Sequence, residues 1–150
     1  MSDLRDLYQQ VILDHQRKPR NFRALSMANR HAEGFNPLCG DKVQLFINME
    51  NGVIKDVGFQ GTGCAISTAS ASMMTESVKG KTPTAAEAIF KKFQDLVTSD
   101  PNQEIPASEL GKLEVFAGVR EFPVRVKCAT LAWHTLRAAL EGEEKAVSTE

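Results

Sequence analysis

The sequence predicts an α+β fold in which a small antiparallel sheet of about three strands packs against several α-helices. An alternating apolar pattern on both sides of an Asn-Gly pair predicts a β-hairpin near the middle of the chain. Segments with apolar residues at helical spacing flank this hairpin on both sides. Because one hairpin is rarely stable alone, we expect the helices to cover one of its faces.

Composition predicts a single domain over residues 1–150. The chain has 150 residues, 42% hydrophobic and 25% charged, which is typical of a soluble domain with a proper core. A formal net charge of −1 argues against a nucleic-acid partner. No apolar run approaches the roughly 18 residues that a membrane span needs. Three widely spaced cysteines, an odd number, favour a reducing compartment, so we expect a cytoplasmic location.

The chain opens with a predicted amphipathic helix over residues 3–17, which Pro19 ends. Its apolar positions are Leu4, Leu7, Tyr8, Val11 and Ile12. Residues 22–35 show no clear period and are predicted to form a loop, with a further short strand near residues 30–35.

The hairpin follows. Apolar and polar residues alternate over residues 43–49, which predicts a strand with one face in the core. Asn51-Gly52 is a strong signal for a tight turn, and a second strand is expected over residues 53–60.

Two helices are predicted next. The first begins at Cys64 and is rich in small residues, so it can pack closely on its neighbours before Gly80 stops it. Thr82 and Pro83 are a helix cap and a first-turn proline, and they begin the second helix. The expected core stripe of the second helix is Ala86, Ile89, Phe93, Leu96 and Val97.

The last third is predicted to hold a polar connection, a short helix and a long final helix. The connection covers residues 98–106, and Ser108 caps a short helix that Gly118 ends. Pro123 precedes the final helix, and residues 142–150 are expected to be a flexible tail. The core stripe of the final helix is Ala129, Ala132, Leu136, Ala139 and Leu140.

The three cysteines have settings that suit a metal ion. Cys39 and Asp41 share one turn, Cys64 follows Gly61-Thr62-Gly63 at a helix N-terminus, and Cys128 lies near the start of the final helix. Three thiolates and one carboxylate are a tetrahedral ligand set for zinc. The helix dipole favours the thiolate form of Cys64. A carboxylate is the weaker ligand for zinc, so such a site would exchange more readily than a four-cysteine site.

The residues alone leave this interpretation open. A Cys-Gly-Asp tripeptide is a weak signal, and a free cysteine often serves as a small buried apolar residue. The chain also lacks the paired Cys-x-x-Cys spacing of a zinc ribbon. An interaction module with buried cysteines is therefore the alternative to a metal protein at this point.

Three local sequences, in this order, give the chain a close resemblance to the IscU/NifU N-terminal family of iron–sulfur assembly proteins, and within it to the SufU branch. They are Asn36-Pro37-Leu38-Cys39-Gly40-Asp41, Gly61-Thr62-Gly63-Cys64-Ala65-Ile66-Ser67 and Lys127-Cys128-Ala129-Thr130-Leu131-Ala132-Trp133. The resemblance covers residues 4–140, and Asp14-His15 with Pro19-Arg20-Asn21 also matches the family pattern.

The resemblance implies an IscU/SufU-like fold and a zinc site. The implied ligands are Cys39, Asp41, Cys64 and Cys128. Scaffold-type members carry a histidine directly before the third cysteine, where this chain has Lys127. SufU-type members carry an insertion between the second and third cysteines, and here 63 residues separate them, with residues 98–118 fitting that insertion.

The implied activity is that of a zinc-dependent sulfurtransferase. It would accept persulfide sulfur from a pyridoxal-phosphate-dependent cysteine desulfurase of the SufS type, and pass it to a downstream iron–sulfur scaffold or acceptor. In this family mechanism a desulfurase histidine replaces the first cysteine on zinc. The alternative is a scaffold that holds a transient 2Fe–2S cluster at the same residues, because thiolates also bind such clusters.

Individual roles are predicted for three residues. Cys39 is the expected sulfur acceptor because it lies in a turn made by Pro37 and Gly40, whereas the other two cysteines begin helices. Arg125, three residues before Cys128, is a candidate for steering the sulfur-bearing loop, by analogy with the family. His15 ends the first helix, where a cation suits the dipole, and its family match suggests the partner interface.

Overall fold

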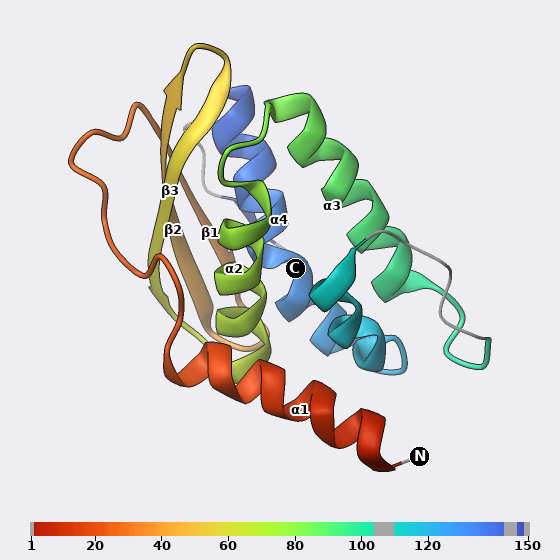
Figure 1. Cartoon of the computed structure of the whole chain (residues 1–150). Coiled ribbons are helices and arrows are strands. Elements are labelled where there is room, and N and C mark those ends of the chain that lie inside the picture. The colour runs from red at the N-terminus through yellow and green to blue at the C-terminus, as the bar shows by residue number, and fades with distance from the viewer. Residues whose placement is uncertain (1, 104–109, 143–146, 149–150) are drawn as a thin grey trace.

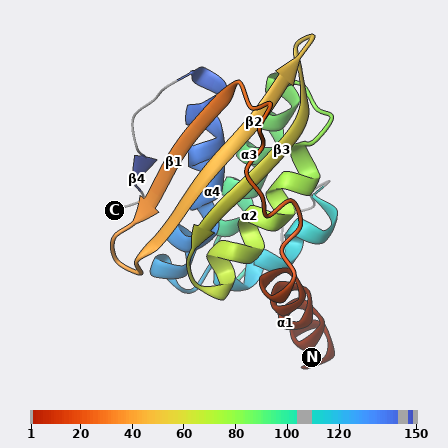
Figure 2. The ribbon, with the colours of Figure 1, turned by 90° about the vertical axis from the view of Figure 1, so that its left-hand side faces the viewer.

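A computed structural model describes residues 2–103, 110–142 and 147–148, and it confirms the predicted α+β class. The elements in order are α1 (Ser2–Arg17), β1 (Arg30–Asn36), β2 (Asp41–Glu50), β3 (Val53–Thr62), α2 (Ala65–Val78), α3 (Pro83–Thr98), the 3-10 helix η1 (Gly111–Val119), α4 (Pro123–Glu141) and β4 (Val147–Ser148). The helices gather on one side of the sheet, and α1 crosses beneath them (Figures 1 and 2). No helix in the described residues is long and apolar enough to span a bilayer.

The sheet has the strand order β3-β2-β1-β4. Its three main strands are antiparallel, as predicted, and the segment near residues 30–35 is the strand β1. The predicted flexible tail is tested only in part, because residues 143–146 and 149–150 lie outside the described residues. Within that tail, the two residues of β4 pair parallel with Gly34 and Phe35 of β1.

The alternation of side chains along β1 and β2 decides which residues reach the helices. On β2 the buried positions start at Asp41 and continue at every second residue through Ile47, and on β1 they end at Asn36. Asn36 and Asp41 are also direct cross-strand partners. Since side chains alternate between the faces of a strand, both polar side chains lie on the helix-covered face, at the end of the sheet.

The core fills two layers, one between the sheet and the helices α2 and α4, and one where α3 packs on α4 and η1. Trp133 of α4 is fully buried, and its ring stacks on Phe93 of α3 with 4.8 Å between the centroids. Its indole N–H donates to Ser70 of α2 at 3.1 Å, which satisfies its one polar group. The stripe predicted for α3 packs against the core, with Ile89 half-buried, but it omits the buried Phe90, which stacks on Trp133.

The short helix before α4 begins later than predicted. Ser108, its expected cap, lies outside the described residues, and the 3-10 helix starts at Gly111 and runs past Gly118 to Val119. Its apolar residues Leu113 and Phe116 are buried, as the sequence predicts.

The end of α1 is attached to α2 through a buried histidine. His15 is only 4% exposed, so its side chain is a structural contact rather than a partner surface. Ser72 Oγ accepts the backbone N–H of Arg20 at 2.8 Å and lies 2.7 Å from His15 Nδ1. A hydroxyl can accept two hydrogen bonds and donate one, so Ser72 Oγ can serve the Arg20 N–H and His15 Nδ1 at the same time. Burial lowers the pKa of His15, and the Arg20 guanidinium lowers it further.

A histidine with a lowered pKa makes stability depend on pH. Below about pH 6.5 the unfolded chain takes up a proton that the folded chain does not, so the free energy of unfolding should fall as the pH is lowered from 7 to 5. We expect a slope of up to about 1.4 kcal/mol per pH unit for this proton. His15→Asn keeps an acceptor for Ser72 and removes the titration, so urea unfolding of this variant should show a shallower slope. Some slope remains, because burial also lowers the pKa of His134. An unchanged slope would contradict the assignment.

Candidate metal centre

The turn between β1 and β2 presents Cys39 to solvent. The carbonyl oxygen of Asn36 accepts the backbone N–H groups of Cys39 at 3.2 Å and Gly40 at 2.8 Å, which closes the turn. Gly40 has φ +72°, a left-handed conformation that glycine adopts without strain. Cys39 is exposed as a result, while the residues at both ends of the turn are buried.

Asp41 is fully buried at the first position of β2. Its Oδ1 accepts the backbone N–H of Cys64 at 2.9 Å. Asp41 forms no ion pair with any described residue. A Cβ atom on Gly63 would lie 2.5 Å from Ser67 Oγ and 2.9 Å from Asp41 Oδ1, so a larger residue here would displace both side chains. A buried carboxylate without a cation is costly, which makes a bound cation its natural partner.

Cys64 is the N-cap residue of α2, as predicted. Its sulfur accepts the backbone N–H of Ser67 at 3.4 Å, at the positive end of the helix dipole. Cys64 Sγ lies 3.9 Å from Asp41 Oδ2 and is half-buried. This cysteine is therefore held by its helix terminus and by the carboxylate.

Cys128 is buried in the second turn of α4, and its sulfur lies 3.4 Å from Cys39 Sγ. Asn36 Nδ2 donates to Cys128 Sγ at 3.6 Å. Burial raises the pKa of the Cys128 thiol far above its ordinary value, and the hydrogen bonds with Asp41 and Cys39 add to that effect. A thiolate at this depth thus needs a compensating cation.

The structure gathers all four predicted ligands at one end of the sheet. One ligand atom each from Cys39, Asp41 and Cys128 lies within 4.8 Å of the others, and no other described cluster of His, Cys, Asp or Glu meets this condition. Cys64 does not meet this distance condition, but its sulfur lies 3.9 Å from Asp41 Oδ2. Three sulfurs and a carboxylate oxygen, two of the four residues buried, fit a tetrahedral zinc ion in donor type and number.

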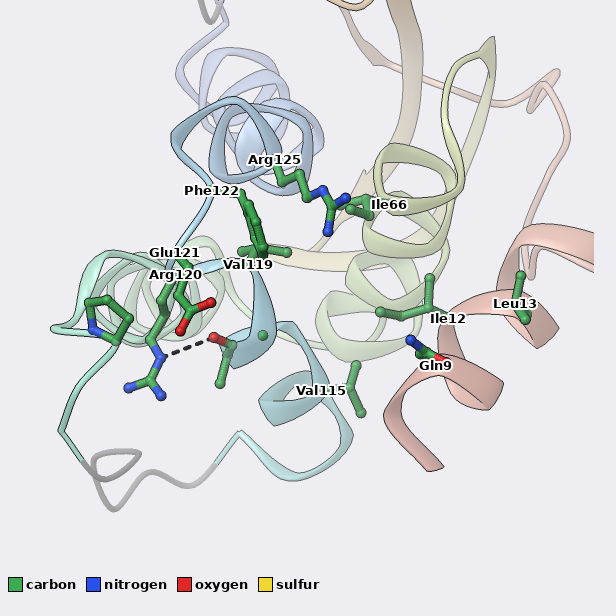
Figure 3. Close-up of a pocket in the computed structure, with 13 residues that line it drawn as sticks. Gln9, Ile12, Leu13, Ile66, Val115, Val119, Arg120, Glu121, Phe122 and Arg125 are labelled. Carbon is green, nitrogen blue, oxygen red and sulfur yellow. Dashed lines mark hydrogen bonds between the residues drawn. The ribbon is translucent and has the colours of Figure 1, made fainter. Parts of the chain in front are cut away.

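Arg125 lies at the edge of this centre. Its guanidinium carbon stacks 4.3 Å above the ring of Phe122, and Arg125 and Phe122 line a shallow hollow together with the three cysteines. The same two residues line an adjoining groove between α1 and η1. Figure 3 shows Arg125 extending toward Ile66, with Ile12 of α1 across the groove. A largely apolar surface that carries Arg125 and Glu121 therefore lies directly beside the sulfurs.

Sequence reasoning missed Asn36 as a site residue, although it stands in the first motif. Ala32, Gly34 and Asn36 are every second residue of β1, which would have placed the amide on the helix-covered face once that strand was recognised. No histidine in the described part of the chain belongs to the cluster. The residue directly before Cys128 is Lys127, which is half-buried on α4.

The fold and the site together define a small α+β domain with a thiolate–carboxylate centre at the edge of its sheet. The family model of the NifU-like N-terminal domain matches residues 7–129. The chain therefore belongs to this family, which also contains the IscU and SufU proteins.

Characterised relatives resemble nearly the whole chain. The chain is 39% identical over 143 residues to the zinc-dependent sulfurtransferase SufU of Bacillus subtilis, covering 95% of both chains. It is 42% identical over 142 residues to the iron–sulfur cluster assembly scaffold protein IscU of Streptococcus pyogenes, covering 94% of this chain and 87% of the relative. A crystal structure of a putative iron–sulfur scaffold of the SUF system from Fervidobacterium islandicum matches with a TM-score of 0.79 at 35% identity, covering 87% and 94% of the two chains.

Proposed function

We propose that this chain is a zinc-dependent sulfurtransferase that accepts persulfide sulfur from a cysteine desulfurase of the SufS type and passes it on for iron–sulfur cluster assembly. The observation that carries the proposal is the unequal burial of the sulfurs. Cys39 is exposed in a turn, whereas Cys128 is buried and Cys64 is held at a helix end. One sulfur can therefore leave the centre while the other three ligands stay in place.

The four residues of the centre would have two different roles, metal binding and nucleophilic attack. Asp41, Cys64 and Cys128 would hold Zn²⁺, which supplies the positive charge that keeps thiols deprotonated at neutral pH. Cys39 acts as the nucleophile: its thiolate attacks the terminal sulfur of the desulfurase persulfide, a new S–S bond forms on Cys39, and the old S–S bond breaks. The electron pair of the broken bond leaves with the desulfurase thiolate, so no oxidant or reductant is consumed.

The surface beside the sulfurs suits a protein partner. Phe122 and Val124 are 42% and 48% exposed, next to the exposed Arg125. We propose that Arg125 steers the persulfide-bearing loop, since its guanidinium is held in place by stacking on Phe122 and forms no ion pair with a described residue. Three free cysteines are consistent with a reducing, cytoplasmic location.

An assay of alanine release by a SufS-type desulfurase tests the function. We expect zinc-loaded protein to increase the rate of alanine formation, because each turnover needs a thiolate that removes the persulfide. Protein stripped by a chelator should lose most of this stimulation and regain it when zinc is restored. Equal stimulation by the loaded and stripped forms would overturn the zinc dependence, and no stimulation by either would overturn the function.

A cluster scaffold is the second candidate, because thiolates bind iron–sulfur clusters and many of the matched proteins are named as scaffolds. The half-buried Lys127 speaks against it, since a protonated lysine cannot ligate a cluster at the position where scaffold-type members have histidine. A purified protein that is colourless and carries one zinc per chain would favour the sulfurtransferase. Brown protein with visible charge-transfer absorption would favour the scaffold.

A further inference from the structure

Asn36 is a fully buried polar residue in contact with the candidate metal centre. It ends β1, and its backbone carbonyl closes the turn that carries Cys39. Its side chain crosses from this turn to α4, where it meets the sulfur of Cys128. A single residue therefore joins the two segments that supply three of the four proposed ligands.

The hydrogen bonds define the orientation of the Asn36 amide. Oδ1 accepts the backbone N–H of Leu38 at 3.2 Å, which is an Asx-turn contact. Only the oxygen of the amide can accept that N–H, so the NH₂ group must face Cys128 Sγ, 3.6 Å away. The observed orientation of the amide therefore makes both the turn contact and the N–H contact to the sulfur. Exchanging the oxygen and the NH₂ group would lose both contacts.

We propose that Asn36 is a positioning residue that keeps Cys128 as the retained sulfur and so leaves Cys39 as the sulfur that departs. A donated N–H offsets part of the negative charge on a thiolate, which makes that sulfur a less reactive nucleophile and holds it in one orientation. Cys128 receives such a bond, whereas in the described residues the one hydrogen-bonding partner of Cys39 Sγ is the Cys128 sulfur. The claim that Asn36 decides which cysteine departs rests on the sulfurtransferase function proposed above. The contact between Asn36 and the Cys128 sulfur does not depend on that function.

Cobalt substitution of the full chain can test this contact directly. Co²⁺ in a thiolate site gives sulfur-to-metal charge-transfer bands, whose energy falls when a hydrogen bond to the sulfur is removed. Asn36→Ser keeps a short acceptor for the Leu38 N–H but cannot reach Cys128. We expect its charge-transfer band to move to longer wavelength. Competition with a chelator should show that the variant binds the metal roughly 10- to 100-fold more weakly than the wild type.

Asn29 offers a matched control. It also makes two side-chain hydrogen bonds, to the backbone of Met49 at 2.8 Å each, but it is exposed just before β1. Asn29→Ala should leave the cobalt spectrum unchanged. If Asn36→Ser does not unfold cooperatively, Asn36→Thr, which fills more of the buried volume and keeps an uncharged hydroxyl acceptor, is used in the same titration with the same expected band shift.

The outcomes separate this inference from the proposed function. An unaltered spectrum and unaltered metal retention in the Asn36 variant would overturn the role of Asn36, even if the wild-type protein stimulates a desulfurase. A shifted band in a protein that never stimulates a desulfurase would support the contact and overturn the sulfurtransferase. Equal shifts in the Asn29 and Asn36 variants would show a general loss of stability and would overturn the inference.

Discussion

Replacing Cys39 with alanine is expected to abolish stimulation of a cysteine desulfurase while leaving the fold intact. Cys39 is exposed in a turn that the backbone carbonyl and the side chain of Asn36 close, so the loss of the Cys39 side chain should change the free energy of unfolding of the metal-free protein by less than about 0.5 kcal/mol. The acceptor thiolate itself is lost, so alanine release should return to the rate of the desulfurase alone.

Mass spectrometry of the wild-type protein after one turnover provides the second measurement. We expect one added sulfur atom on the peptide that contains Cys39. Cys64→Ala and Cys128→Ala serve as comparisons, because both should lose activity together with zinc and stability, whereas Cys39→Ala should keep three ligands. Persulfide found only on Cys64 would refute the assignment of Cys39 as the acceptor.

Replacing Asp41 with asparagine is expected to have opposite effects on stability with and without zinc. In zinc-loaded protein the substitution removes a ligand, and a metal at 100 times its Kd contributes about 2.7 kcal/mol to stability, much of which should be lost. In metal-free protein it removes a buried charge without an ion pair in the described structure, while the amide oxygen still accepts the Cys64 N–H. We expect a gain on the order of 1–3 kcal/mol in that state.

Thermal unfolding in zinc and in chelator measures both effects. Asp56→Asn is the matched control, since Asp56 is an aspartate of β3 that pairs with Arg23 and Lys79 at the surface. Its effect on the unfolding midpoint should not depend on zinc. If Asp41→Asn destabilises the chelated and the loaded protein equally, Asp41 is a structural hydrogen-bond acceptor and not a metal ligand.

Most secondary structure could be predicted because its signals are local. The Asn51-Gly52 turn, the Thr82 cap and the proline at the start of α4 each act through a few neighbouring residues. Predictions were weaker where distant contacts decide the structure. β1 lacks a run of apolar residues, since Gly34 faces Thr135 of α4 so closely that no Cβ would fit there.

The same division holds for the site. Turn and helix-start signals singled out Cys39, Asp41 and Cys64, and the resemblance to the family implied these residues and Cys128 as one ligand set. His15 shows the limit of local reasoning: the end of a helix suggests an exposed cation, whereas packing against α2 buries the ring against Ser72 and lowers its pKa.

Local sequence therefore decides that the first cysteine lies in a glycine turn, that the second begins a helix and that a strand with one buried face follows the turn. Tertiary packing decides which sulfur reaches solvent, and it brings Asn36 and Cys128, 92 positions apart, into contact. The physical reason is that burial and hydrogen bonding of a side chain depend on the elements packed around it. Those elements come from the other end of the chain, beyond the reach of any local pattern.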